Sequence, residues 1–190
     1  MNYPHVCQFK VEKIHGNEEV QITLYSGVTV FVGPNAAGKT QPLKALRNYL
    51  RSSPNNKKVR YLSSNRIGTM ETYRSKVNHM SYSPDNYTVG SQDDKRQRIQ
   101  IETATGDFFT MDEKKDVFIK VAERLSVLFK RQVYLKWDSG NLKVFFEKTE
   151  TQKEYSVVVE ASGLVNVISI LAALFDKDVE VLSSDQYFLL

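Results

Sequence analysis

The sequence has little cysteine and histidine and no long apolar run. Cys7 is the only cysteine among 190 residues, which excludes an intrachain disulfide and a cysteine-rich zinc site and favours a reducing compartment. The longest nearly apolar stretch, Leu164 to Phe175, is too short for a membrane helix. The first ten residues lack the charged start and apolar stretch of a secretion signal. We therefore expect a cytoplasmic protein that has no membrane partner.

The overall composition is that of an ordinary globular protein. Apolar residues make up 41% of the chain and charged residues 25%, which argues against disorder and fibrous repeats. A chain of this length can bury a real core, and one compact domain with a subdomain is the expected organisation.

Positive charge is concentrated in the middle of the chain. The whole sequence has 26 basic and 22 acidic residues, but residues 47–98 have 11 basic against 4 acidic. This segment is either a solvated basic insertion or a surface that meets nucleic acid. Three tyrosines in it, Tyr73, Tyr82 and Tyr87, offer rings that stack on bases. The candidate nucleic-acid contacts are Arg60, Arg66, Arg74, Lys76, Lys95, Arg96 and Arg98.

Hydrophobic periodicity divides the chain into three segments, 1–62, 63–98 and 99–190. In the first, a β-branched and aromatic run over 28–32 predicts a strand buried on both faces, and residues 39–50 have helical spacing. The first segment ends in a short predicted strand at 59–62. The second segment has no clear period and is predicted to be a basic insertion or loop. The third predicts helices over 116–130 and 162–175, a hairpin at 133–146, strands at 155–159 and 179–182, and the start of a helix at 186–190.

One motif matches a phosphate-binding loop in full. Residues 33–40 read G-P-N-A-A-G-K-T, which fits the P-loop (Walker A) pattern G-x-x-x-x-G-K-[ST]. The glycines allow backbone N–H groups to wrap a phosphate, the lysine meets the β- and γ-phosphates, and the threonine hydroxyl ligates Mg²⁺. The motif lies between a strand pattern and a helix pattern, as it should. The predicted nucleotide-binding residues are Gly33, Pro34, Asn35, Ala36, Ala37, Gly38, Lys39 and Thr40.

A second segment has the chemistry of an anion site. Ser162 and Gly163 open the predicted helix over 162–175, where free N–H groups, a hydroxyl and the absence of a bulky side chain suit a phosphate. An ordinary serine N-cap without a ligand is the alternative.

The two motifs together resemble ABC-type ATPase heads, the group that holds the SMC, Rad50, RecF and OLD-like proteins. G-P-N-A-A-G-K-T is similar to their Walker A, and E-A-S-G-L-V-N at 160–166 is similar to the degenerate signature of OLD-like ATPases. The strings N-K-x-D and D-x-x-G, typical of GTPases, do not occur. The resemblance implies an α/β P-loop NTPase fold with a mixed sheet, a β-hairpin lobe and a signature helix. It also implies ATP and Mg²⁺ as cofactors and a dimer in which Ser162 and Gly163 reach the nucleotide held by the other subunit.

The sequence departs from this family where the catalytic carboxylates are expected. Asp185 stands where an aspartate for Mg²⁺ belongs, but Gln186 occupies the place of the general base, and glutamine cannot accept a proton as a carboxylate does. All three histidines, at 5, 15 and 79, lie far upstream, so no histidine switch follows. Either the head is divergent and hydrolyses ATP poorly, or the sequence is incomplete near 182–183 or beyond 190. No catalytic residue is assigned, and the ATPase activity stays open.

The leading functional prediction is an ATP-binding head that dimerises on nucleotide and regulates a nucleic-acid-directed effector. The resemblance extends to ATPase subunits of bacterial anti-phage systems, Septu-like or retron-linked, in which a nuclease is a separate chain or domain. This chain has no H-N-H motif and no clustered carboxylates, so we do not expect it to cut DNA itself. The alternative is a nucleotide-gated scaffold that assembles without turnover.

Overall fold

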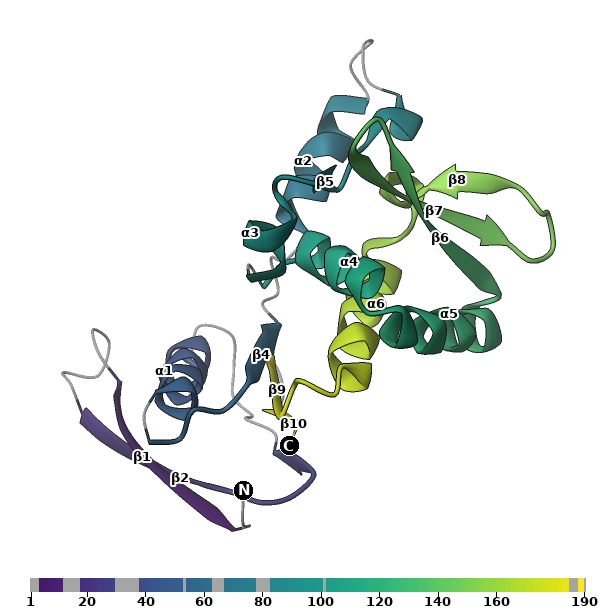
Figure 1. Cartoon of the computed structure of the whole chain (residues 1–190). Coiled ribbons are helices and arrows are strands. Elements are labelled where there is room, and N and C mark those ends of the chain that lie inside the picture. The colour runs from purple at the N-terminus through teal and green to yellow at the C-terminus, as the bar shows by residue number, and fades with distance from the viewer. Residues whose placement is uncertain are drawn as a thin grey trace. The chain divides into compact units, whose positions relative to one another are not determined.

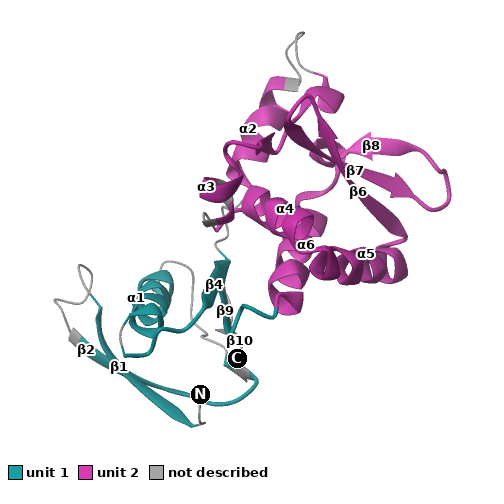
Figure 2. Cartoon of the chain, in the orientation of Figure 1, with its two compact units in different colours: residues 1–64, 177–190 teal, residues 65–176 magenta. Residues whose placement is uncertain are grey.

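The chain forms two compact units in a computed structural model, residues 1–64 with 177–190 (unit 1) and residues 65–176 (unit 2) (Figure 2). The structure describes residues 4–11, 18–29, 38–52, 54–62, 67–77, 83–100, 102–184 and 188–189. Helices and several sheets occur together, so the fold is mixed α/β as predicted (Figure 1). The segment 63–98, predicted from the sequence as a separate insertion, falls almost entirely within unit 2.

Unit 1 is built around one helix between two sheets. Strands β1 (His5–Val11) and β2 (Glu18–Leu24) form an antiparallel pair, and β3 (Val28–Thr29), β10 (Phe188–Leu189), β9 (Val181–Ser184) and β4 (Val59–Leu62) form a sheet in that order. Helix α1 (Thr40–Arg51) buries Leu43, Leu46 and Leu50 against side chains from both sheets. Burial of each leucine contributes about 1.5–3 kcal/mol, so α1 is the packing centre of this unit.

The strand directions in unit 1 define a parallel crossover. Strand β4 runs parallel to β9, whereas β10 is antiparallel to both β9 and β3. Two antiparallel steps restore direction, so β3, β9 and β4 all run the same way. The chain therefore passes from β3 through α1 to the parallel strand β4, which is a β–α–β unit.

Unit 2 packs helices against a small antiparallel sheet. Strands β5 (Gly90–Ser91), β7 (Asn141–Lys148), β6 (Arg131–Asp138) and β8 (Glu154–Ser156) pair around β7. The core is filled from these strands and from α4 (Ala104–Glu113), α5 (Lys115–Phe129) and α6 (Ser162–Phe175). The remaining elements are α2 (Gly68–Val77), α3 (Lys95–Gln100) and the short 3₁₀ turns Pro84–Asn86 and Val157–Val159.

Several predicted elements are confirmed and others are corrected. Helices α1, α5 and α6, strand β4 and the β6–β7 hairpin lie where the periodicity placed them. The segment 63–98 is not a plain loop, because it contributes α2, β5 and α3. The tail predicted to start a helix instead pairs as β10 with β9 and β3. The predicted strand at 155–159 turns into 3₁₀ after Ser156, and most of the strand predicted at 28–32 lies outside the described residues.

Candidate functional site

The end of the predicted phosphate loop is positioned by a left-handed glycine. Gly38 has φ +78°, a conformation that glycine adopts without steric cost, and its carbonyl accepts a hydrogen bond from the Gln41 N–H at 3.1 Å. Lys39 already has helical dihedrals, and Thr40 is the first residue of α1. This turn joins the loop directly to the helix, as the motif requires. Gly33 to Ala37 lie outside the described residues.

The N-terminus of α1 lacks neutralising groups of its own. Its first turn contains no acidic residue, and its N-cap, Lys39, makes no side-chain cap hydrogen bond. The positive end of the helix dipole therefore lies at the end of the motif, with no acidic side chain in the first turn to neutralise it. Such a terminus favours an anion.

The carboxyl ends of the parallel strands β3, β9 and β4 lie at the same edge of the sheet. Leu62 at the end of β4 pairs with Ser184 at the end of β9, and Thr29 in β3 lies in the row of Phe188 and Ser183. In open α/β sheets ligands bind outside the carboxyl ends of the strands. Asp185, the predicted metal ligand, and Gln186 lie outside the described residues. Among the described residues, no three His, Cys, Asp or Glu side chains gather as a metal site.

In unit 2, the hydroxyl of Ser162 is held by α2. It donates a hydrogen bond to Glu71 Oε1 at 2.6 Å and accepts one from Arg74 Nη1 at 2.5 Å. The N-cap of α6 is Ala161, so Ser162 is a first-turn residue and not the N-cap. The hydrogen bond from Ser162 is the main reason that the pKa of Glu71 lies below its ordinary value, with Arg74 adding to it.

Arg74 and Arg131 fix the chain just before α6. Arg74 donates to the carbonyls of Val158 (2.7 Å) and Glu160, and it bonds Glu71 as well. Arg131 Nε donates to Glu160 Oε2 at 3.2 Å, and the Tyr155 hydroxyl bonds the same oxygen. Burial opposes ionisation of Glu160, but the hydrogen bonds from Tyr155, the Ala161 N–H and Arg131 outweigh it and lower its pKa. The turn that presents Ser162 is therefore rigidly anchored.

No close contact in the described part of the chain requires a glycine at position 163. A Cβ atom built at this position meets nothing within 4 Å, and its backbone is not left-handed. Glycine costs a helix roughly 0.5–1 kcal/mol relative to alanine. The open space over Gly163 is available to a group from outside the chain.

The predicted nucleic-acid contacts do not form one surface on a single element. Arg60 belongs to β4 in unit 1, whereas Arg74 and Lys76 lie in α2 and Lys95, Arg96 and Arg98 in α3 of unit 2. Arg74 is engaged before α6, and Lys95 Nζ lies 3.1 Å from Asp112 Oδ2. Arg66 lies outside the described residues.

Both of the stacking candidates that the structure describes, Tyr73 and Tyr87, make contacts within the chain. Tyr87 is buried, and its ring packs edge-on against Tyr73 at 5.0 Å. The Tyr73 hydroxyl donates to the Ser83 carbonyl. Burial therefore keeps the Tyr87 ring from a base, whereas the Tyr73 ring is only partly buried. Tyr82 lies outside the described residues.

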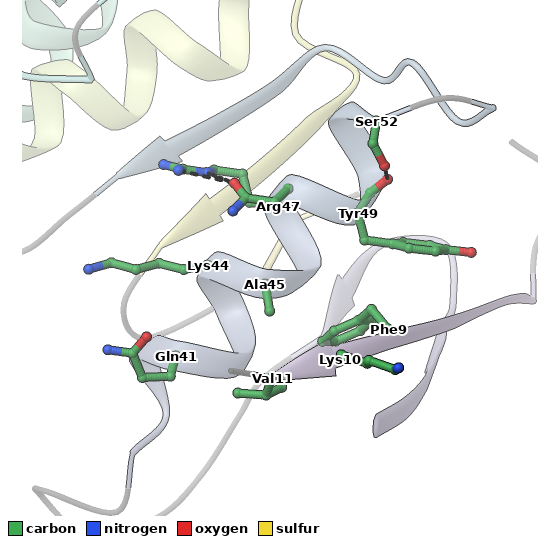
Figure 3. Close-up of a pocket in the computed structure, with 10 residues that line it drawn as sticks. Phe9, Lys10, Val11, Gln41, Lys44, Ala45, Arg47, Tyr49 and Ser52 are labelled. Atoms are coloured by element: carbon green, nitrogen blue, oxygen red, sulfur yellow. Dashed lines mark hydrogen bonds between the residues drawn. The ribbon is translucent and has the colours of Figure 1, made fainter. Parts of the chain in front are cut away.

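A groove of about 620 Å³ runs along α1 beside β1 (Figure 3). Lys44 and Arg47 extend from one side of the helix, and Tyr49 packs on Phe9 at 5.8 Å on the β1 side. Among the described residues, the lining contains the basic Lys10, Lys44 and Arg47 and no acidic side chain. Arg47 is already engaged, because it bonds Asn48 and lies over the Tyr61 ring. We assign no ligand to this groove.

The side chains that lie beside the two motifs in the structure could not be identified from the sequence. Glu71, Arg131 and Tyr155 gave no signal, because their role depends on contacts between segments far apart in the chain. Ser183 was visible only as a polar residue at the end of an apolar strand. It is fully buried, and its Oγ has no hydrogen-bond partner in the part of the chain that the structure describes.

Comparisons with protein-family models, with curated proteins and with solved structures found no match to this chain. No helix in the described ranges combines the length and apolar character that a membrane crossing needs.

Proposed function

We propose that this chain is the nucleotide-binding head of an ABC-type ATPase. The observation that carries the proposal is the setting of the Walker A sequence: its last residues form a left-handed turn into α1, and α1 connects the parallel strands β3 and β4. A strand–loop–helix setting distinguishes a working P-loop from a chance match. The acid-free first turn of α1 gives further support.

ATP with Mg²⁺ is the proposed ligand. Lys39 pairs with the β- and γ-phosphates, and the backbone N–H groups of the loop surround them. Mg²⁺ uses few protein oxygens when a substrate supplies phosphates, so the Thr40 hydroxyl fits this metal although the described residues contain no cluster of metal ligands. When bound, Mg²⁺ neutralises phosphate charge; Lys39 and Thr40 hold and orient the nucleotide.

Ser162 and Gly163 are proposed to contact the nucleotide of a second copy. The anchored turn before α6 fixes the Ser162 hydroxyl, and the open space over Gly163 leaves room for a phosphate group from the partner. Two heads would then close head-to-tail around two nucleotides. Regulation of a nucleic-acid-directed effector in anti-phage defence, such as a nuclease subunit, rests on the family resemblance.

A nucleotide-gated scaffold without turnover is the second candidate, favoured by Gln186 in place of a general base. Sedimentation with ATP, with a non-hydrolysable analogue and without nucleotide tests both, together with a phosphate-release assay. Dimer formation with either nucleotide and no phosphate release supports the scaffold. Dimer formation with phosphate release that Lys39→Ala abolishes supports the ATPase. A chain that stays monomeric with both nucleotides contradicts the dimeric head.

A further inference from the structure

The hydroxyl of Ser183 is buried, and no partner for it occurs among the residues that the structure describes. The residue is 0% exposed, and no hydrogen bond reaches its Oγ in the described part of the chain. A buried hydroxyl that makes no hydrogen bond destabilises the folded state, because it gives up water and gains nothing in return. Such a group needs an explanation, and a ligand that supplies the missing bond is one.

The side chain of Ser183 lies on the face of the sheet that α1 covers. Successive side chains of a strand alternate between faces, so Ser183 shares the face of Val181, which packs in the same cluster as the leucines of α1. Ser183 also pairs in register with Tyr61, and the Tyr61 ring lies 5.3 Å from the Arg47 guanidinium carbon of α1. The alternation with Val181 and the register with Tyr61 both place the Ser183 side chain on the α1 side of the sheet.

Ser183 also lies near the carboxyl end of β9, which is the end of the sheet that faces the N-terminal half of α1. The C-terminus of α1 lies at the start of β4, because the Lys57 N–H donates to the Leu50 carbonyl at 2.8 Å and Arg51 bonds the Val59 carbonyl. Val59 pairs with Val181, and the strands run on from there toward the N-terminal half of the helix. Ser183, which pairs with Tyr61, therefore lies two residue pairs closer to the carboxyl edge, on the side where α1 begins.

We infer that the Ser183 hydroxyl donates a hydrogen bond to an oxygen of the bound Mg²⁺–nucleotide, either on a phosphate or on water held by the metal. This inference rests on the proposed nucleotide site. Neither the P-loop motif nor the signature assigns this residue. The hydroxyl is kept at a cost to the free protein, and the nucleotide removes that cost by accepting the bond.

Ser183→Ala separates this role from a purely structural one. The variant loses an unsatisfied buried hydroxyl, so its thermal midpoint without nucleotide should be equal to or higher than that of the wild type. Its affinity for ATP should fall about ten- to a hundredfold, because it loses a hydrogen bond to a charged group. A structural serine would show the opposite pattern, with reduced stability and unchanged affinity.

Two further variants complete the design. Ser183→Cys keeps the shape but offers only a weak donor, so it should lose affinity as well. Ser169→Ala is the matched control, since Ser169 is equally buried but its hydroxyl donates to the Val165 carbonyl in α6. Calorimetric titration with ATP, repeated in EDTA, distinguishes the two oxygens: a loss that persists without Mg²⁺ indicates a phosphate, and a loss that disappears indicates metal-bound water.

Unchanged ATP affinity in both Ser183 variants, with and without Mg²⁺, would overturn the inference while leaving the nucleotide site intact. A wild-type chain that does not bind ATP would instead overturn the proposed function along with it.

Discussion

The side chains around the start of α6 are each held by more than one partner. Arg74 bonds Glu71, Ser162 and two backbone carbonyls, and Glu160 accepts from Tyr155, Arg131 and the Ala161 N–H. A guanidinium suits this role because its planar fork satisfies several acceptors in fixed directions. The segment is therefore pre-positioned, which is what a contact with an external group requires.

The contribution of ionised Glu160 to the free energy of unfolding should depend on pH. Its pKa is lower in the folded than in the unfolded chain, so its contribution is present above the unfolded value of about 4.3 and is lost as the pH falls through the folded value. Glu160→Gln should reduce the free energy of unfolding by about 1–3 kcal/mol at pH 7. Urea denaturation at pH 7 and at pH 4 should show that this difference shrinks in acid.

Glu154→Gln is the matched control for that measurement. Glu154 pairs with Lys136 at 2.5 Å near the surface, so its removal should change the free energy of unfolding by less than about 1 kcal/mol at either pH. A Glu160→Gln penalty that stays constant between pH 7 and pH 4 would show that the charge of Glu160 does not matter.

Among the elements, helix α6 contains a glycine, Gly163, that lowers helix stability and leaves open space beside the helix. Gly163→Ala should raise the free energy of unfolding by roughly 0.5–1 kcal/mol, because alanine favours the helix and no atom in the described part of the chain beyond the adjacent helix backbone lies within 4 Å of its methyl group. The same methyl group should weaken ATP-dependent dimerisation, because it projects into the space proposed for the partner's nucleotide. Thermal denaturation and sedimentation equilibrium measure the two effects.

A Gly163→Ala variant that is more stable and dimerises as well as the wild type would contradict the contact between subunits. Gly140→Ala provides the comparison: Gly140 also meets nothing within 4 Å, but its φ of +77° makes alanine strained, so that variant should be less stable.

Elements with a strong local pattern could be predicted from the sequence. The hairpin turn Asp138-Ser139-Gly140-Asn141 could be predicted from its turn-forming residues. In the structure Ser139 and Gly140 adopt the positive φ that such a tight turn needs. Helices α5 and α6 were found from their apolar spacing. Helix α4 was missed because it is buried on nearly every side and has no amphipathic stripe. Helix α2 was missed because few of its side chains reach the core.

The candidate site could be predicted only in its contiguous parts. The P-loop and the Ser162-Gly163 segment are short strings whose chemistry is local. The roles of Glu71 and Ser183 come from pairing between distant segments, such as Ser183 with Tyr61, which no local pattern specifies. The two strand residues of β10 were read as a helix start because a short tail has no period to measure.

At the scale of the whole molecule, the positive charge belongs to one unit. Unit 1 contains 10 basic and 6 acidic residues, and unit 2 contains 16 of each, so the net charge of +4 lies with the proposed phosphate site. No acidic residue occurs between positions 20 and 70, whereas eight basic residues do. The predicted basic middle is thus divided between the two units, and in unit 1 two of its lysines, Lys57 and Lys58, pair with Glu180 and Asp178. The net positive charge of unit 1 attracts a polyanionic nucleotide.

Binding of Mg²⁺–ATP by the wild-type chain is the decisive measurement for the proposed nucleotide site. We expect titration calorimetry of the chain with Mg²⁺–ATP to show saturable binding that Lys39→Ala weakens by a hundredfold or more, since it removes a charge-assisted contact to phosphate. Lys44→Ala removes the same charge one turn along α1 and should bind within about twofold of the wild type. Equal loss in both variants would mean that only general charge attracts the nucleotide, and no binding by the wild type would contradict the account.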